Sequence, residues 1–423
     1  MRFHKWIQKS SQTKFFTFFC LLCLLTGQTT AVFATTDTAV DYDTDAAMRL
    51  EEPIDSNAID GWPTGPVVGA EGAILLEANT GTILYAKNIH EHLYPASTTK
   101  ILTTLVAIEN SDLNDMVEFS NEAVFSIEQK SSNMGMDVGQ SITMEQCLYG
   151  ILVYSANEVC NAVGEHIAGS ISGFVDMMNA KAAELGCTDS HFVTTNGLHD
   201  ENHYTSPYDL ATIARAFFSN ETLTRIAGTS HYTIEPTATQ PDLIDLYTHN
   251  KLTNNTYPYE GYIGGKTGYT SQAGYCLSAS AERGGMELIA VVMHCKSSVD
   301  RFESAKALLN YGFSNYALVT PEPEDGIPPV PVVLGTQEFV TPVPQSDAPL
   351  LLEKARAAQI RTSVETDTSV RAPVAAGQQL GRMTVTAGDE TVAEIPLVAP
   401  AEIPARTFPD LWAELLGKIC FSQ

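Results

Sequence analysis

Residues 94–100 read YPASTTK, and the architecture expected for this 423-residue chain follows from this stretch and two others. It places Ser97 and Lys100 directly before an apolar run with helical spacing over residues 101–108. Residues three apart on a helix lie on the same face, so the hydroxyl and the amine can meet. Serine is a weak nucleophile that needs an adjacent base, and an amine can act as that base only if its pKa is lowered. S-x-x-K alone occurs by chance on many helices, so further motifs must support it.

The other two stretches supply polar groups suited to the same site. The sequence SAN at residues 155–157 falls at a predicted loop-to-helix corner, where a hydroxyl can relay a proton and an amide can orient a lysine. A serine that only caps the helix is the alternative. The sequence KTG at residues 266–268 follows two glycines in a predicted strand, where glycine lets a substrate backbone approach closely. Lys266 supplies a positive charge and Thr267 a hydroxyl donor for a carboxylate.

The order of the three stretches matches a known set of motifs. S-x-x-K, then S-x-N, then K-T-G is the serine set of penicillin-binding proteins and class A β-lactamases. Over residues 67–316 the chain resembles the D-alanyl-D-alanine carboxypeptidases, the low-molecular-mass penicillin-binding proteins of bacterial cell walls. Further matches are NGL at 196–198, SPYDLA at 206–211 and AGYCL at 273–277. The resemblance implies an α+β fold: a β-lactamase/transpeptidase-like catalytic domain, with an antiparallel sheet flanked by helices, followed by a small all-β domain.

The resemblance also implies a catalytic group made of Ser97, Lys100, Ser155 and Asn157. Ser97 would attack the carbonyl between the two terminal D-alanines of a peptidoglycan stem pentapeptide. Lys100, neutral in the free enzyme, would take the serine proton, and the nearby Lys266 would help to lower its pKa. Ser155 would relay a proton to the departing D-alanine, while Asn157 positions Lys100 and the substrate. Water would then hydrolyse the acyl-enzyme, and the reaction requires no metal or organic cofactor.

The substrate-binding residues implied by the resemblance lie on the third motif and after it: Lys266, Thr267, Gly268, Tyr269 and Arg301. Lys266 and Thr267 would hold the terminal carboxylate, and Arg301 would share this task. The backbone N–H groups of Ser97 and Tyr269 would form the oxyanion hole. We expect β-lactam antibiotics to bind at the same site as covalent inhibitors.

Three other activities share parts of this pattern. A DD-endopeptidase acting on cross-links uses the same chemistry. A class A β-lactamase also needs a glutamate between the second and third motifs for deacylation, and neither Glu165 nor Glu201 is a convincing candidate. A catalytically inactive cell-wall binding protein is the last alternative, and the intact motif residues argue against it.

Composition argues against some classes of function. The chain has 24 Lys and Arg against 50 Asp and Glu, a formal charge of −26, and hydrophobic residues make up 44%. The charge argues against nucleic-acid binding and against electrostatic docking to an anionic bilayer, because both rely on basic side chains. The apolar content predicts a packed core.

The N-terminus is typical of an export signal. Basic residues precede an apolar run over residues 15–25, which is too short to span a bilayer, and residues 32–34 offer a cleavage site. We expect a signal peptide over residues 1–34, with export to the extracytoplasmic face of the membrane or the cell wall; an uncleaved signal anchor is the alternative. Residues 35–66 are rich in Asp and Glu and show no hydrophobic period, which predicts a solvated acidic linker.

The character of the chain changes after about residue 316. Prolines mark a linker, and short alternating stretches over residues 317–401 predict a β-rich domain. Residues 402–423 predict an amphipathic helix, with Phe408, Trp412 and four aliphatic residues on one face. This helix either makes a peripheral membrane contact or packs against the protein's own body.

Hydrophobic periodicity predicts several local elements. We expect a hairpin of residues 73–76 and 82–86, and a helix opened by a capping box at residues 143–146 that continues to about residue 153. A further helix starts near Ser155. Residues 207–218 predict a helix, 274–279 and 287–294 predict strands, and a helix containing residues 302–309 is expected to end at Gly312.

Histidines and cysteines receive structural interpretations. The sequence HDENH at residues 199–203 predicts a surface loop, with a zinc site as the alternative. The cysteines within the catalytic domain sit among apolar residues and are predicted to be small core residues: Cys147, Cys160, Cys187, Cys276 and Cys295. A disulfide between Cys276 and Cys295 is the alternative for that pair.

Overall fold

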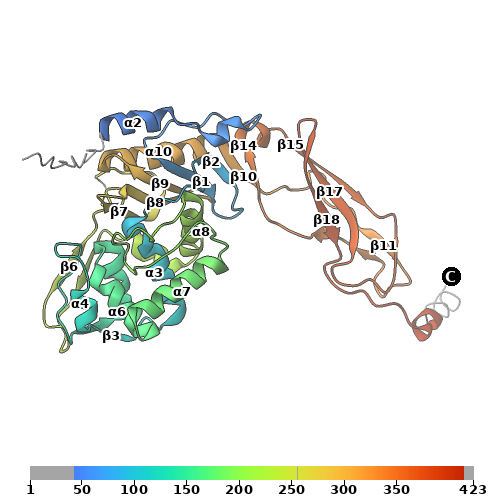
Figure 1. Cartoon of the computed structure of the whole chain (residues 1–423). Helices are drawn as coiled ribbons and strands as arrows, with labels where there is room; N and C mark the ends of the chain where they lie inside the picture. Colours follow the sequence, from blue (N-terminus) through green and yellow to red (C-terminus); the bar gives the residue numbers. More distant parts are fainter. Residues whose placement is uncertain (1–41, 255, 414–423) are drawn as a thin grey trace, which may run out of the picture. The chain divides into compact units, whose positions relative to one another are not determined.

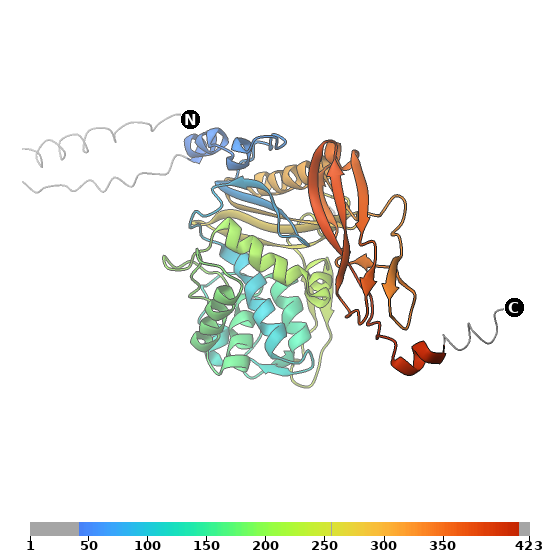
Figure 2. The same cartoon turned by 90° about the vertical axis from the view of Figure 1, so that its right-hand side faces the viewer.

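The computed structural model describes residues 42–254 and 256–413 (Figures 1 and 2). The predicted signal peptide, the first residues of the predicted linker and the end of the predicted C-terminal helix (414–423) lie outside the described residues. Within the described part of the chain, no helix is both long and apolar enough to cross a bilayer.

A five-stranded antiparallel sheet organises the catalytic domain. Its order is β2-β1-β9-β8-β7, and its strands are β1 (Gly72–Glu77), β2 (Ile83–Lys87), β7 (Tyr262–Thr270), β8 (Gly274–Arg283) and β9 (Met286–Cys295). The hairpin predicted around residues 73–86 is β1 and β2, paired from Ala73 opposite Lys87 to Leu76 opposite Ile83. The predicted strands at 274–279 and 287–294 are β8 and β9, and both are longer than expected. The third motif lies on β7, at the edge of the sheet.

The sheet has a hydrophobic core on each face. Along β9, Ile289, Val291 and Met293 belong to one buried cluster, whereas their alternating neighbours belong to the other. This alternation follows from the pleat of a strand, which points successive side chains to opposite faces. Helix α10 (Ser298–Asn315) covers one face, and α8 (Pro207–Phe218) packs on β9 and β1 from the other (Figure 1).

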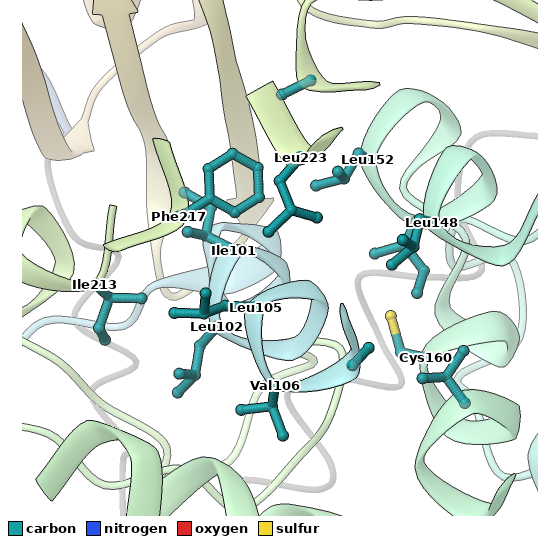
Figure 3. Packing of buried hydrophobic residues seen from close by; sticks show 14 of the residues in the cluster. Ile101, Leu102, Leu105, Val106, Leu148, Leu152, Cys160, Ile213, Phe217 and Leu223 are labelled. Atoms are coloured by element: carbon teal, nitrogen blue, oxygen red, sulfur yellow. The ribbon is translucent and has the colours of Figure 1, made fainter. Parts of the chain in front are cut away.

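Helix α3 (Lys100–Asn110) runs through the middle of the helical half of the domain. Figure 3 shows four of its apolar residues surrounded by Leu148, Leu152 and Phe217 from three other elements; the four are Ile101, Leu102, Leu105 and Val106. The remaining elements of this half are η2 (Ala96–Thr99), β3 (Met116–Glu118), α4 (Asn121–Phe125), β4 (Ser141–Thr143), α5 (Met144–Tyr149), the π-helical turn η3 (Gly150–Tyr154), α6 (Asn157–Ala168), α7 (Ile171–Glu184), α9 (Glu221–Ala227), β5 (His231–Ile234) and β6 (Ile244–Tyr247). A helix that carries Lys100 is therefore fixed by packing along most of its length.

Two helix boundaries show how the sequence signals work and where they fail. The capping box is confirmed, because Thr143 accepts from Gln146 N–H and Gln146 accepts from Thr143 N–H. The prediction that a helix ends at Gly312 is wrong, because α10 continues to Asn315. A Cβ on Gly312 would lie 2.4 Å from Leu288 and 2.8 Å from Leu75, so this glycine allows close helix–sheet packing instead of capping the helix.

Residues 46–66 differ from the expected solvated linker. They contain the end of α2 (Tyr42–Glu51) and the short helix η1 (Asp55–Ala58). The buried ammonium of Lys87 donates to the carbonyl of Arg49 at 2.5 Å and lies 3.3 Å from the carboxylate of Glu52. A buried cation requires acceptors. The acidic segment supplies two of them and the carbonyls of Val68 and Ala70 the others, so the segment packs on the catalytic domain.

A second set of strands follows α10. β10 (Tyr316–Val319) pairs with β14 (Leu350–Glu353). The remaining elements of this region are β11 (Val330–Val333), β12 (Phe339–Val340), β13 (Val343–Pro344), α11 (Lys354–Ala357), β15 (Ile360–Thr366), β16 (Val370–Arg371), β17 (Gln379–Ala387) and β18 (Glu390–Val398). A buried apolar cluster that includes Val330, Val374 and Ile403 forms the core of this β domain. Residues 408–413 are helical, which is the described part of the predicted C-terminal helix.

Candidate active site

The first motif places its serine and lysine at the junction of η2 and α3. Lys100 is fully buried, and its Nζ donates to Ser97 Oγ at 3.0 Å, to Asn157 Oδ1 at 2.6 Å and to the carbonyl oxygen of Asn196 at 2.7 Å. The three acceptors satisfy the three N–H groups of an ammonium. Ser97 and Lys100 therefore meet as the motif spacing predicted, and Asn157 joins them as the resemblance implied. Asn196 of the NGL segment supplies the third acceptor.

The second motif adopts a strained turn. Ser155 has φ of 69°, in the left-handed region that non-glycine residues rarely adopt. It separates η3 from α6 and is not the N-cap, which is Ala156, so the alternative of a capping serine is wrong. The turn directs Ser155 Oγ toward Lys266 Nζ, which donates to it at 3.0 Å. Strain of this kind persists only where the surroundings hold it, and it is concentrated at functional sites.

The third motif brings the edge strand β7 against the turn that carries Ser97. Lys266 is buried on β7 and also donates to the carbonyl of Thr267 at 3.0 Å. A Cβ on Gly268 would lie 2.7 Å from the carbonyl oxygen of Pro95 and 3.1 Å from Ser97 N, so only glycine allows this approach. Tyr269 is exposed. Strand β7 thus lies directly beside the turn that carries Ser97.

Burial changes the acid–base properties of both lysines. Desolvation lowers the pKa of Lys100 to about 8, and nearby Cys160 and Glu158 partly offset this effect. Desolvation, and then the charge of Lys100, lower the pKa of Lys266. Burial is therefore the dominant cause for both lysines, and the help expected from Lys266 in lowering the pKa of Lys100 is not found among its causes.

Arg301 lies on α10, which covers the opposite face of the sheet from α8, and its side chain reaches the third motif. Its side chain is buried, and one guanidinium nitrogen donates to the carbonyl of Gly268 at 3.0 Å and to that of Cys276 at 3.5 Å. Its Nε has no hydrogen-bond partner among the described residues. Arg301 therefore supports the backbone of the third motif while also lining the cleft described next.

A cleft of about 540 Å³ opens above these groups. Besides motif residues, it is lined by several residues that the sequence did not indicate: Lys130, Ser131, Ser132, Asn133, Tyr154 and His249. The segment around Ser132 is fixed because the N–H of Asn157 donates to the Ser132 carbonyl at 2.8 Å. Burial, Lys266 and Arg301 lower the pKa of His249. A lone histidine and a polar loop carry no periodic or motif signal, so sequence reasoning had no means of finding them.

The histidine and cysteine interpretations have different outcomes. His203 is only 2% exposed, so the surface-loop prediction is wrong for this residue. All five cysteines predicted to be core residues are buried, and among the described residues they are free thiols. Cys276 and Cys295 lie on adjacent strands but do not form the alternative disulfide.

Two parts of the chain match known protein families. Residues 62–297 match the family described as D-alanyl-D-alanine carboxypeptidase, and residues 324–405 match the penicillin-binding protein 5 C-terminal domain. The chain belongs to the D-alanyl-D-alanine carboxypeptidase family. Its members are serine hydrolases, and the family and fold predicted from the three motifs are confirmed.

Curated relatives and solved structures agree with this membership. The carboxypeptidase DacF of Bacillus subtilis is 33% identical over 82% of this chain and 89% of its own length. DacA of Escherichia coli is 30% identical over 82% of this chain and 86% of its own. Penicillin binding protein 5 of Haemophilus influenzae superposes with a TM-score of 0.66 at 28% identity, covering 81% of this chain and 99% of its own. The Streptomyces K15 DD-transpeptidase has a TM-score of 0.56 at 29% identity and covers 60% of this chain and all of its own.

Proposed function

We propose that the protein is a serine D-alanyl-D-alanine carboxypeptidase that removes the terminal D-alanine from peptidoglycan stem pentapeptides through an acyl-enzyme. The observation that carries this proposal is the position of Lys100 Nζ, 3.0 Å from Ser97 Oγ in a buried site. Neutral lysine keeps two N–H groups, which Asn157 Oδ1 and the Asn196 carbonyl accept. Its lone pair is then left to face Ser97 Oγ, which is the geometry a general base requires.

The acylation step follows from this geometry. Lys100 takes the proton of Ser97 as Oγ bonds to the carbonyl carbon between the two D-alanines. The tetrahedral intermediate carries its negative charge against the backbone N–H groups of Ser97 and Tyr269. When the C–N bond breaks, the proton that Lys100 took from Ser97 passes through Ser155, which is hydrogen-bonded to Lys266, to the departing nitrogen, and Lys100 is neutral again. Water then attacks the ester and regenerates Ser97.

The substrate carboxylate is held by the third motif. Thr267 and Arg301 line the cleft and offer a hydroxyl and a guanidinium to this carboxylate, and Lys266 lies buried beside Thr267 on the same strand. A charge-assisted hydrogen bond to a carboxylate is about twice as strong as a neutral one. β-Lactams carry a carboxylate beside a reactive amide, so they acylate Ser97 in the same orientation.

The cellular setting is part of the proposal. Peptidoglycan lies outside the cytoplasm, which agrees with the export signal expected at residues 1–34. Phe408 and Trp412 are 75% and 52% exposed, which favours peripheral membrane contact over packing against the protein's own body. Aromatic residues on an amphipathic helix suit the bilayer interface.

Ser97→Ala is the direct test. Purified residues 35–423 are incubated with a stem pentapeptide, released D-alanine is measured, and a fluorescent penicillin is used as a covalent label. We expect wild type to release D-alanine and Ser97→Ala to lose both release and labelling. Retained labelling of Ser97→Ala would refute the assignment of the nucleophile. Product analysis on cross-linked muropeptides distinguishes a carboxypeptidase from a DD-endopeptidase.

A further inference from the structure

His203 lies in a hydrogen-bonded chain that ends at the nucleophile turn. Its Nδ1 accepts from the backbone N–H groups of Val193 and Thr194 at 3.1 and 3.2 Å. Because Nδ1 accepts, the ring proton is on Nε2, and Nε2–H donates to Thr99 Oγ1 at 2.8 Å. Thr99 in turn donates to the carbonyl of Ala96 at 2.8 Å. Burial lowers the pKa of His203 to about 3, which keeps the ring in this neutral form at pH 7.

Both ends of this series of hydrogen bonds adjoin groups that the reaction uses. Ala96 directly precedes Ser97 and has φ of 48°, a left-handed conformation that a non-glycine residue adopts only when its surroundings enforce it. At the other end, the segment that contains Val193 and Thr194 continues to Asn196, whose carbonyl accepts from Lys100 Nζ. A Cβ on Gly197 would lie 1.9 Å from the Ala96 carbonyl oxygen, so this segment also packs against the turn at Ala96 and Ser97.

We propose that His203 is a positioning residue for acylation of the serine, acting through Thr99 on the Ala96 carbonyl and through the 193–197 segment on Lys100. This inference rests on the proposed function, because it assumes that Ser97 and Lys100 perform the acylation. His203 joins two segments that are more than 90 residues apart in sequence, and each fixes one member of the Ser97–Lys100 pair. Loss of the link would leave the cleft in place while displacing the reacting atoms, and small displacements of that kind are costly in rate.

The test uses variants that separate hydrogen bonding from packing. His203→Phe keeps a ring but removes both nitrogens, and Thr99→Val keeps the shape but removes the hydroxyl. Thr99→Ser is the conservative variant that retains the hydroxyl. Phe192→Leu is the matched packing control. The Phe192 ring packs edge-on against the His203 ring, with the ring centroids 5.5 Å apart, and makes no polar contact with it. The double variant His203→Phe/Thr99→Val completes a double-mutant cycle.

Each variant of residues 35–423 is assayed for its acylation rate constant with fluorescent penicillin, for kcat and KM with the pentapeptide, and for Tm. We expect His203→Phe and Thr99→Val each to lower acylation by about 10- to 100-fold, mainly in kcat, as for loss of a buried hydrogen bond that matters in the transition state. The double variant should be no slower than the slower single variant. Thr99→Ser should acylate within about twofold of wild type, and Phe192→Leu should lower Tm without lowering the acylation rate.

Several results would overturn the inference. His203→Phe that folds and acylates at the wild-type rate would refute it, as would single-variant effects that multiply in the double variant. If His203→Phe fails to fold, the comparison of Thr99→Val with Thr99→Ser decides, because equal rates for that pair would refute the link. A wild type that does not label with penicillin would instead refute the proposed function.

Discussion

Lys100 is the residue whose protonation should set the pH dependence of the reaction. Its pKa is lowered by burial to about 8, and only the neutral amine can accept the serine proton. Below pH 8 the neutral fraction falls about tenfold per pH unit. We therefore expect the penicillin acylation rate to rise with pH between 6 and 8 and to level off above that range. Stopped-flow acylation across pH 6–9.5 measures this profile, and a rate that is flat between pH 6 and 8 would contradict the role of Lys100 as base.

Lys100→Met separates the base from the space it occupies. Methionine fills most of the volume of the lysine stem but cannot accept a proton, so acylation should fall by about 10²- to 10⁴-fold, the usual contribution of a general base. The measurement is time-resolved labelling with fluorescent penicillin, with circular dichroism to check that the fold is retained. Labelling of a folded Lys100→Met at near the wild-type rate would show that another group activates Ser97.

At the scale of elements, the close approach of β7 to η2 should be as important as the side chains it carries. Gly268→Ala would place a Cβ 2.7 Å from the Pro95 carbonyl oxygen and 3.1 Å from Ser97 N. The strand or the serine turn must then move, and we expect acylation to fall by at least about tenfold. Gly69→Ala is the matched control, because its Cβ would meet only Asp300 at an ordinary 3.8 Å. Equal acylation rates for the two variants would show that the approach does not position Ser97.

The packing of residues 46–66 on the catalytic domain leads to a second prediction at this scale, which concerns stability. The Lys87 ammonium binds the carbonyls of Arg49 and Ala70 at 2.5 and 2.7 Å, so Lys87→Met leaves buried acceptors without a donor. We expect the free energy of unfolding to fall by about 1–3 kcal/mol, with penicillin acylation unchanged. Urea unfolding measures this free energy. The control is Lys306→Met, at a more exposed lysine that pairs with Glu303 at 3.6 Å and lies 5.9 Å from the centroid of the Tyr257 ring. Equal stability of the two variants would mean that the segment does not depend on Lys87.

The sequence predicts elements better than it predicts the contacts between distant elements. The order of the three motifs carried a family resemblance, which implied one site, and the structure brings Lys100 to Ser97 and Asn157, and Lys266 to Ser155. Long-range contacts outside these motifs had no such signal. Two acceptors for Lys87, the Arg49 carbonyl and the Glu52 carboxylate, come from an acidic segment that reads as a linker by composition. His203 reads as a loop residue until its partner Thr99 is known. Both depend on long-range packing, which a hydrophobic period does not encode.

At the scale of the whole molecule, net charge and local charge have opposite signs. The chain carries −26, and loss of residues 1–34, with four Lys or Arg and no acid, would change this to −30. The cleft, by contrast, is lined by Lys130 and Arg301 above the buried Lys266. A small carboxylate is thus attracted only once it is close, because overall charge is screened over about 8–10 Å at physiological salt.

The net negative charge of the chain also leads to a prediction about membrane contact. Phe408 and Trp412 are exposed and their rings stack with centroids 6.1 Å apart, so binding through them should be apolar. We expect residues 35–423 to co-sediment with zwitterionic phosphatidylcholine vesicles at least as well as with vesicles containing anionic phosphatidylglycerol, the reverse of what a basic anchor would do. Phe408→Ser/Trp412→Ser should reduce binding, whereas Phe339→Ser, at a 54% exposed aromatic of the β domain, should not. Binding that survives the double variant, or that requires anionic lipid, would rule out an apolar contact through these two rings.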